Sequence, residues 1–193
     1  MQQKYITNSP AIASYNWVDM NAGTGLEDYY CMQQTNTGGT TYHLITQAYA
    51  GQGTAASYGR TIGASTCNFD TTVFNLPRSI RGTAYLSCEV NGDSTATVTI
   101  SAKLQKVSKG VASDISSTIT KTISVSTSVV KSGVFLAIPI TSKTYLAIND
   151  YIRLVFTCST DNGTIKIGVD PLSANDMIPL KISIPYAVEV NTP

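Results

Sequence analysis

The sequence contains a single histidine, and any serine-type hydrolase chemistry would depend on it. A catalytic triad needs a histidine that is oriented by a carboxylate and that faces a nucleophile. His43 stands between Tyr42 and Leu44, in a run typical of a strand, and the chain has no nucleophile-elbow pattern. We therefore expect a strand histidine with an ordinary hydrogen bond, although spacing alone leaves a triad open.

Two short motifs of cofactor-binding or catalytic proteins also occur, and both lack the helix that their chemistry needs. Residues 51–56 match the G-x-G-x-x-A pattern of dinucleotide-binding loops, in which a helix N-terminus meets the pyrophosphate. Gly59 and Gly63 would break such a helix, so we interpret the segment as a Gly/Ala loop. Residues 128–131 fit S-x-x-K, but they fall at the end of a predicted strand, where a chance match is expected.

The acidic and thiol side chains are too scattered to indicate a metal site. Zinc needs clustered cysteine or histidine ligands, and calcium needs several neighbouring carboxylates. The four cysteines show no C-x-x-C spacing, and we expect them to be small buried hydrophobes. A catalytic carboxylate pair stays open among the 12 acidic residues, although several aspartates fall at predicted turns. We expect no metal, no cofactor and no catalytic residue.

The strongest periodicity in the chain is that of a β-strand. From residue 115 to 129 every even position carries a hydroxyl group, while the odd positions include isoleucine and valine. Successive side chains of a strand point to opposite faces, so the pattern predicts a ribbon with one hydroxylated and one mostly apolar face. Similar alternation recurs at short spacing, which predicts an all-β fold, an antiparallel β-sandwich that is jelly-roll-like. The other predicted strands are 28–34, 41–49, 71–76, 83–90, 95–107, 134–141, 151–158, 165–169 and 178–184.

Turn residues and prolines predict how these strands connect. Asn91-Gly92 and the Asp-Asn-Gly run at 161–163 predict two tight hairpins, because both favour positive φ. The strand 151–158 has apolar residues on both faces and is predicted to be central. Pro179 and Pro185 cannot donate to a ladder, so the last strand is predicted at a sheet edge.

The first third of the chain differs in composition from the rest. Residues 1–60 contain Trp17 and 7 of the 11 tyrosines. We interpret residues 1–26 as an extended N-terminal arm and residues 27–193 as a single β-sandwich domain. Tyrosine and tryptophan enrich at protein interfaces, although the same rings could cap the sandwich or stack on sugars. The candidate interface residues are Tyr5, Tyr15, Trp17, Tyr29 and Tyr30.

Charge and hydropathy exclude two classes of partner. The net charge is +1 and no stretch concentrates lysine or arginine, so we expect no direct nucleic-acid partner. No apolar run approaches the roughly 18 residues that span a bilayer, so we expect no membrane partner. The N-terminus also lacks the apolar stretch of a signal peptide, which favours synthesis in a cytoplasm.

The segment from Thr144 to Phe156 resembles a strand start of viral and tumour-necrosis-factor-like jelly rolls. In these, a hydrophobic residue precedes a Gly/Asn-Asp turn and an alternating strand follows. The matching residues are Leu146, Asn149, Asp150, Ile152, Leu154 and Phe156. Together with its composition, the chain resembles structural proteins of tailed phages, such as capsid decoration, head-fibre and tail-associated subunits.

The resemblance implies a non-enzymatic virion structural protein that is made in the host cytoplasm. Such a subunit would dock on capsid or tail proteins of the same particle through its N-terminal region and form a homo-oligomer, for example a trimer. The alternative is a glycan- or receptor-binding module of a phage fibre or tail. A hydrolase that depends on His43 is a third hypothesis.

Overall fold

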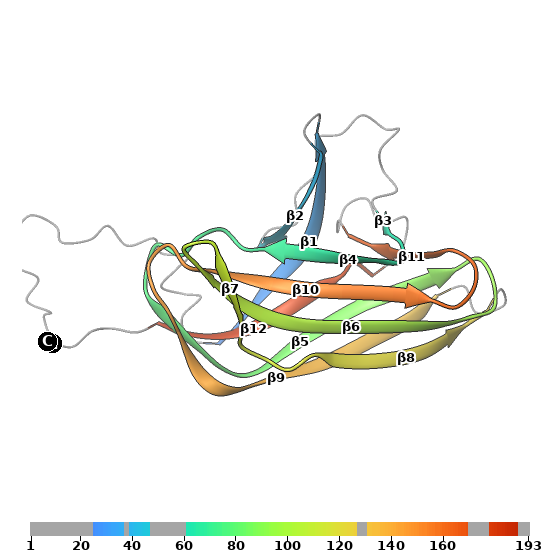
Figure 1. Ribbon diagram of the computed structural model, residues 1–193. Helices are drawn as coiled ribbons and strands as arrows, with labels where there is room; N and C mark the ends of the chain where they lie inside the picture. Colours follow the sequence, from blue (N-terminus) through green and yellow to red (C-terminus); the bar gives the residue numbers. More distant parts are fainter. Residues whose placement is uncertain (1–24, 37–38, 47–60, 127–130, 170–177, 189–193) are drawn as a thin grey trace, which may run out of the picture.

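The computed structural model describes residues 25–36, 39–46, 61–126, 131–169 and 178–188, and every regular element in this part is a β-strand (Figure 1). The predicted all-β class is therefore confirmed. The strands are β1 (Leu26–Asn36), β2 (Gly39–Ile45), β3 (Thr61–Ile62), β4 (Ser65–Asp70), β5 (Arg78–Gly92), β6 (Ala96–Ser108), β7 (Val111–Asp114), β8 (Ile119–Val125), β9 (Ser132–Leu146), β10 (Tyr151–Thr160), β11 (Ile165–Gly168) and β12 (Lys181–Val188).

The strands make a jelly-roll-like sandwich with two layers. One layer runs β9–β5–β12–β1 and the other runs β4–β10–β6–β8, with β7 beside β6. The β1–β2 hairpin joins the layers, because β2 lies parallel to β4 at the pair His43 and Asp70. All other pairings among the described strands are antiparallel.

The core follows from the alternation that the sequence shows. In β10 every second residue from Ile152 to Cys158 is buried, and β6 repeats this from Ala96 to Leu104. Phe69 and Phe156 are among the largest fully buried side chains between the layers. The four cysteines are free thiols inside this core, as predicted for small buried hydrophobes: Cys31, Cys67, Cys88 and Cys158.

The hydroxylated ribbon is shorter than its pattern predicts. The chain bends between β7 and β8, where the Ser116 hydroxyl accepts a hydrogen bond from the Leu104 amide at 2.9 Å. The Ile115 amide donates to the Leu104 carbonyl at 3.0 Å, so residues 115–118 form an irregular stretch along the edge of β6, and the register shifts there between the pairings of β7 and β8. Strand pairing begins only at Ile119, and residues 127–130 lie outside the described part.

Both hairpins predicted from Asn-Gly turns are wrong, because each turn carries the chain from one layer to the other. Asn91 and Gly92 belong to β5 and pair with β11, so the turn lies at residues 93–95. Gly163 does turn with a φ of 66°, but β10 pairs with β4 and β6 whereas β11 pairs with β3 and β5. A turn motif fixes the bend of the chain but not the partner of the strand that follows.

The last described strand is central, which corrects its predicted position at an edge. β12 lies between β5 and β1, with Lys181 opposite both Ser87 and Tyr30. The ladder tolerates Pro185 because the register shifts between Ser183 and Tyr186 at this point. The predicted central position of β10 is confirmed, whereas residues 71–76 form a loop and not a strand.

The turn before β10 is built around one buried carboxylate. Asp150 accepts a hydrogen bond from the Ala147 amide at 2.8 Å, and its carboxylate lies 2.9 Å from the Lys106 ammonium group. Asn149 takes the left-handed conformation, with a φ of 69°. Burial raises the pKa of Asp150, but hydrogen bonds from Ser108, Lys106 and the Ala147 amide outweigh it, and the pKa lies below its usual value. The Asn-Asp pair therefore makes the turn that the sequence indicates.

Candidate interaction surface

The predicted interface residues fall into three groups. Tyr29 is only 4% exposed, its hydroxyl donates to Glu27 at 2.7 Å, and its ring meets Tyr186 edge-on, so it belongs to the core. Tyr30 is half-buried on the outside of β1, and the Lys181 ammonium group lies 5.8 Å from the centre of its ring. Tyr5, Tyr15 and Trp17 lie outside the described residues, as does the arm up to residue 24.

His43 lies in a strand, with a threonine as its hydrogen-bond partner. Its Nε2 atom is 3.0 Å from the Thr41 hydroxyl. Asp70, its neighbour in register, binds Arg153 through two hydrogen bonds of 2.7 and 2.8 Å. This arrangement agrees with the expected strand histidine. The G-x-G-x-x-A segment and residues 128–130 lie outside the described part.

The described residues contain neither a cluster of metal-binding side chains nor a membrane-spanning helix. No group of three or more histidine, cysteine or acidic side chains lies close enough together there to hold a metal ion. The same residues contain no helix long and apolar enough to cross a membrane.

The outer face of the β4–β10–β6–β8 layer is hydroxylated, and we call it the hydroxyl face. Neighbouring strands place their hydroxyl groups side by side, as in the pair Thr99 and Thr122 at 3.4 Å and the pair Thr66 and Thr157 at 3.0 Å. Such short polar side chains hydrogen-bond each other and water. The face consists of Thr66, Thr97, Thr99, Ser101, Thr120, Thr122, Ser124 and Thr157.

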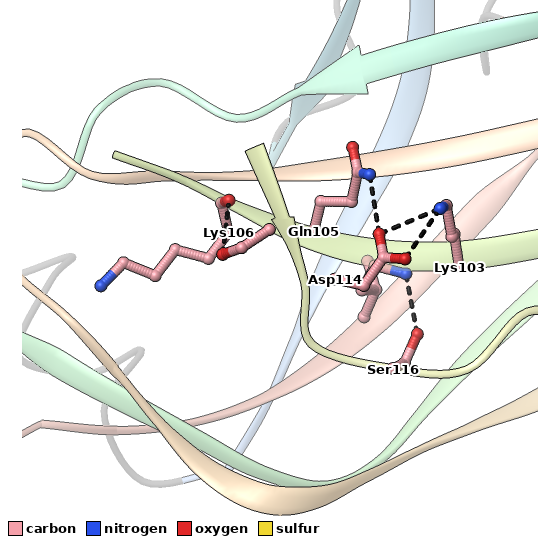
Figure 2. A network of polar contacts seen from close by, with 7 residues as sticks. Lys103, Gln105, Lys106, Asp114 and Ser116 are labelled. Carbon is pink, nitrogen blue, oxygen red and sulfur yellow. Dashed lines mark hydrogen bonds and ion pairs between the residues drawn. The ribbon is translucent and has the colours of Figure 1, made fainter. Parts of the chain in front are cut away.

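A network of polar contacts continues this surface towards β7 (Figure 2). The Lys103 ammonium group lies 2.9 Å from the Asp114 carboxylate, and the Gln105 amide donates to the same carboxylate at 2.8 Å. The hydrogen bonds from Gln105 and Lys103 hold the pKa of Asp114 below its usual value. These groups satisfy one another's hydrogen bonds across β6 and β7. The network therefore holds β7 against β6 and is not an open binding site.

The outer face of the other layer is apolar and aromatic along β5 and β9, and we call it the aromatic face. Tyr85 of β5 and Phe135 of β9 are 38% and 55% exposed, and their rings stack with centroids 5.6 Å apart and an interplanar angle of 21°. Ala137 lies opposite Tyr85, and Pro139 lies opposite Thr83. The face comprises Thr83, Tyr85, Ser87, Phe135, Ala137, Pro139, Lys181, Ser183, Pro185, Leu26, Asp28 and Tyr30.

An ion pair borders the aromatic side chains. The Lys181 ammonium group lies 2.6 Å from the Asp28 carboxylate, which also accepts a hydrogen bond from the Ser183 hydroxyl. Burial raises the pKa of Asp28, but the hydrogen bonds of Lys181 and Ser183 and the lysine charge lower it by more, so Asp28 stays ionised. The face is therefore polar along β12 and β1 and apolar along β5 and β9.

The sequence does carry a signal for this face, although its residues belong to no catalytic motif. In strands 83–90 and 134–141 the buried hydrophobic residues occupy even positions, such as Leu86 and Leu136. Tyr85 and Phe135 occupy odd positions, where a polar residue is expected on an outer face. An aromatic side chain out of phase with the core is the pattern that could reveal such a surface.

Comparisons with known proteins identify structures with a similar fold but do not identify a function. No protein-family model matches the sequence, and no curated protein matches it. Among solved structures, the chain is similar to a CocE/NonD family hydrolase from Staphylococcus aureus, with a TM-score of 0.55 and 9% identity over 84% of this chain. It is also similar to an α-amino acid ester hydrolase, with a TM-score of 0.57 and 11% identity over 83% of this chain.

The chain spans 36% of the length of each of these hydrolases. At such identities the likeness concerns the fold alone, and no catalytic residue can be transferred to this sequence. The chain therefore shares a β-sandwich fold with part of each hydrolase.

Proposed function

We propose that the chain is a non-enzymatic structural subunit of a virus particle. In this proposal the sandwich is a building block that docks on capsid or tail proteins of the same particle through its N-terminal region. The aromatic face is the observation that carries the proposal. Its stacked Tyr85 and Phe135 rings, with Ala137 and Pro139 beside them, form an apolar surface on a sheet that has no covering layer among the described residues.

Physical arguments connect such a surface with assembly. Exposed contiguous apolar patches are uncommon on monomers and usually mark an interaction site. Aromatic side chains enrich in protein interfaces, and here the polar pair Lys181 and Asp28 lies beside them on β12 and β1. The hydroxyl face on the opposite layer has no such pair of stacked, exposed rings among the described residues. The two faces thus suit a subunit that is buried on one side and hydrated on the other.

The direct test is to look for the chain in purified particles of the virus whose genome encodes it. Mass spectrometry of gradient-purified particles should detect the chain in a fixed ratio to the major capsid protein. Its absence from those particles would refute the proposal. Hydrolysis of an ester substrate that is lost in a His43→Ala variant would refute the non-enzymatic part.

The docking role of the N-terminal region needs a separate experiment. Particles stripped of the chain should bind the added full-length protein but not a variant that lacks residues 2–24. That deletion leaves all described strands intact, and circular dichroism would verify the fold. Equal binding by the two proteins would exclude the N-terminal region as the docking element.

A glycan- or receptor-binding module is the second candidate function. The observation that favours it is the combination of exposed rings with charged side chains, because sugars stack on aromatic rings and hydrogen-bond to groups such as Asp28 and Lys181. Binding to a glycan array that is lost in Tyr30→Ala and Tyr85→Ala variants would support this function over the first.

A further inference from the structure

We infer that Asn162 is a modification site, at which water converts the side-chain amide into a carboxylate without an enzyme. The pair Asn-Gly occurs twice in the sequence, at 91–92 and at 162–163. Asparagine is among the chemically labile residues, and a following glycine leaves the backbone amide beside it without a shielding side chain. The two pairs lie in different structural settings, and the folded chain favours the reaction at the second. This chemistry requires nothing of the proposed function.

The reaction, a deamidation, proceeds in two steps. In the first, the Gly163 backbone nitrogen bonds to the side-chain carbonyl carbon of Asn162 and closes a cyclic imide. The bond from that carbon to the side-chain nitrogen breaks, and this nitrogen leaves as ammonia with the proton of the Gly163 amide. In the second, water adds to one of the two imide carbonyls and breaks its bond to the ring nitrogen. One proton of the water restores the backbone amide and the other goes to solvent, which leaves aspartate or isoaspartate.

Asn162 lies where this reaction meets little resistance. Asn162 and Gly163 are exposed and belong to the turn between β10 and β11, outside any strand. Gly163 has a φ of 66°, and its backbone amide donates no hydrogen bond to another of the described residues. The attacking nitrogen is therefore not committed to a ladder. Exposed loop tips are also where chemical change of folded proteins concentrates.

The other pair is held in a strand. Asn91 and Gly92 belong to β5 and lie opposite Lys166 and Ile165 of β11. An extended backbone keeps the side-chain carbonyl carbon away from the next amide nitrogen, so ring closure needs a change of backbone conformation. A Cβ atom added to Gly92 would lie 2.8 Å from a side-chain carbon of Val125, so the main chain is closely packed here. The strands must open locally before Asn91 can react.

Two contacts restrain the turn at Asn162 without tying it into a sheet. The Asn162 side-chain amide donates to the Thr95 carbonyl at 3.2 Å. A Cβ atom added to Gly163 would overlap the Ser94 hydroxyl, so this hydroxyl limits how far the turn can move. One exposed hydrogen bond breaks more easily than a strand pairing. We therefore expect the rate at Asn162 in the folded chain to lie between that of Asn91 and that of the unfolded chain.

The modification would weaken the contact between two turns at this end of the sandwich. The Asn162 amide is a donor, whereas a carboxylate only accepts and would face the Thr95 carbonyl without a hydrogen bond. The new charge would directly follow Asp161, whose carboxylate accepts a hydrogen bond from the Thr97 amide at 2.7 Å. Isoaspartate also adds a carbon to the main chain beside Gly163, which has no spare room. The turn that carries the chain between the layers should therefore loosen as the protein ages.

Peptide mapping by mass spectrometry tests the inference on the purified full-length chain, kept in mildly alkaline buffer. Trypsin places the two asparagines on separate peptides, 82–103 and 154–166, and a digest at time zero corrects for reaction during digestion. The mass change from amide to carboxylate should accumulate at Asn162 at least about tenfold faster than at Asn91, because only Asn91 needs strand opening. A higher pH should speed the reaction, since the attacking nitrogen must lose its proton. In urea the two sites should react at similar rates.

Two variants provide the controls. Asn162→Gln keeps the amide but would need a larger ring, so peptide 154–166 should stay unchanged. Asn162→Asp imitates the aspartate product and should unfold at a lower urea concentration than Asn162→Gln at neutral pH. This difference should vanish in acid, because a protonated carboxyl group can again donate to the Thr95 carbonyl.

Three outcomes would overturn the inference. They are an Asn162 that stays intact in the folded chain, equal rates at Asn162 and Asn91 in the folded chain, and a faster rate at Asn91. An Asn162→Asp variant as stable as Asn162→Gln at neutral pH would refute the predicted loosening of the turn. All of these measurements use the purified chain, so their failure leaves the proposed place of the chain in a particle untouched.

Discussion

Replacing Glu27 with glutamine tests whether a buried ion pair holds the first described strand in its sheet. Arg78, the first residue of β5, is 2% exposed, and its guanidinium group lies 3.5 Å from Glu27 Oε2. The same group lies 4.5 Å from the centre of the Phe74 ring and 5.2 Å from that of Tyr186. The Tyr29 hydroxyl donates to Glu27 at 2.7 Å. The ion pair thus connects β1 with β5, and its guanidinium group lies against two aromatic rings.

The expected loss of stability can be worked from this geometry. Two unit charges 3.5 Å apart attract by about 5 kcal/mol at an effective dielectric constant of about 20. Solvent weakens this, because the Glu27 side chain remains 14% exposed. Glutamine keeps an oxygen that can accept the tyrosine hydrogen bond, and the aromatic rings still attract the cation by about 1 kcal/mol. We therefore expect Glu27→Gln to lower the free energy of unfolding by about 2–3 kcal/mol, near the lower end of values for broken buried pairs.

Urea unfolding followed by far-UV circular dichroism would measure this loss. The control removes both charges, in the variant Glu27→Gln/Arg78→Met, since methionine fills the space of the arginine stem without leaving a buried cation. The double variant should be more stable than Glu27→Gln alone, which gives a positive coupling between the two sites. A loss below about 0.5 kcal/mol for Glu27→Gln, or a double variant no more stable than it, would refute this account of the pair.

Three further predictions concern the turns and the core. Gly163→Ala should destabilise the fold by about 2 kcal/mol or more, because the residue has a φ of 66° and an added Cβ atom would lie 1.7 Å from a serine hydroxyl. The control is Gly133→Ala, whose added Cβ atom would have no other atom within 4 Å and which should be nearly neutral. Thermal unfolding compares the two variants. Asp150→Asn should lower the free energy of unfolding by about 1–3 kcal/mol. Because the folded-state pKa of Asp150 is lowered, the carboxylate stabilises the fold above the unfolded pKa of 3.8, and this stabilisation is lost as the pH falls through the folded-state pKa. The stability of the variant should therefore lack this part of the pH dependence. Burial raises the pKa of Cys88 and Cys158 to about 12, so a thiol reagent at neutral pH should label them only as fast as the protein unfolds, and rapid labelling without urea would contradict their burial.

The sequence predicts the strands better than it predicts their partners. Alternation locates β6 and β10 almost to the residue, because a strand with one face in the core must place an apolar side chain at every second position. The same local pattern cannot tell whether the chain returns beside its own strand or crosses to the other layer. That choice depends on long-range packing, which is why Gly92 lies within β5 and not in a hairpin turn.

The aromatic face could be predicted only in part. The odd positions of Tyr85 and Phe135 mark them as outward-facing once the strands are known. Their stacking depends on β9 pairing with β5 in one particular register, in which Ala137 lies opposite Tyr85. Tyr29 was predicted at an interface but lies in the core. Tyrosine content alone cannot distinguish a ring that packs in the core from one that offers a contact surface.

The central position of β12 has a consequence for how the chain folds as it is synthesised. β1 and β5 do not pair with each other as strands and are bridged by a strand that leaves the ribosome after both of them. Their neighbouring backbone groups must stay hydrated, or be shielded by a chaperone, until residues 181–188 emerge. A ribosome stalled before this point would display an incomplete layer, so the native state should form only after residues 181–188 have left the ribosome.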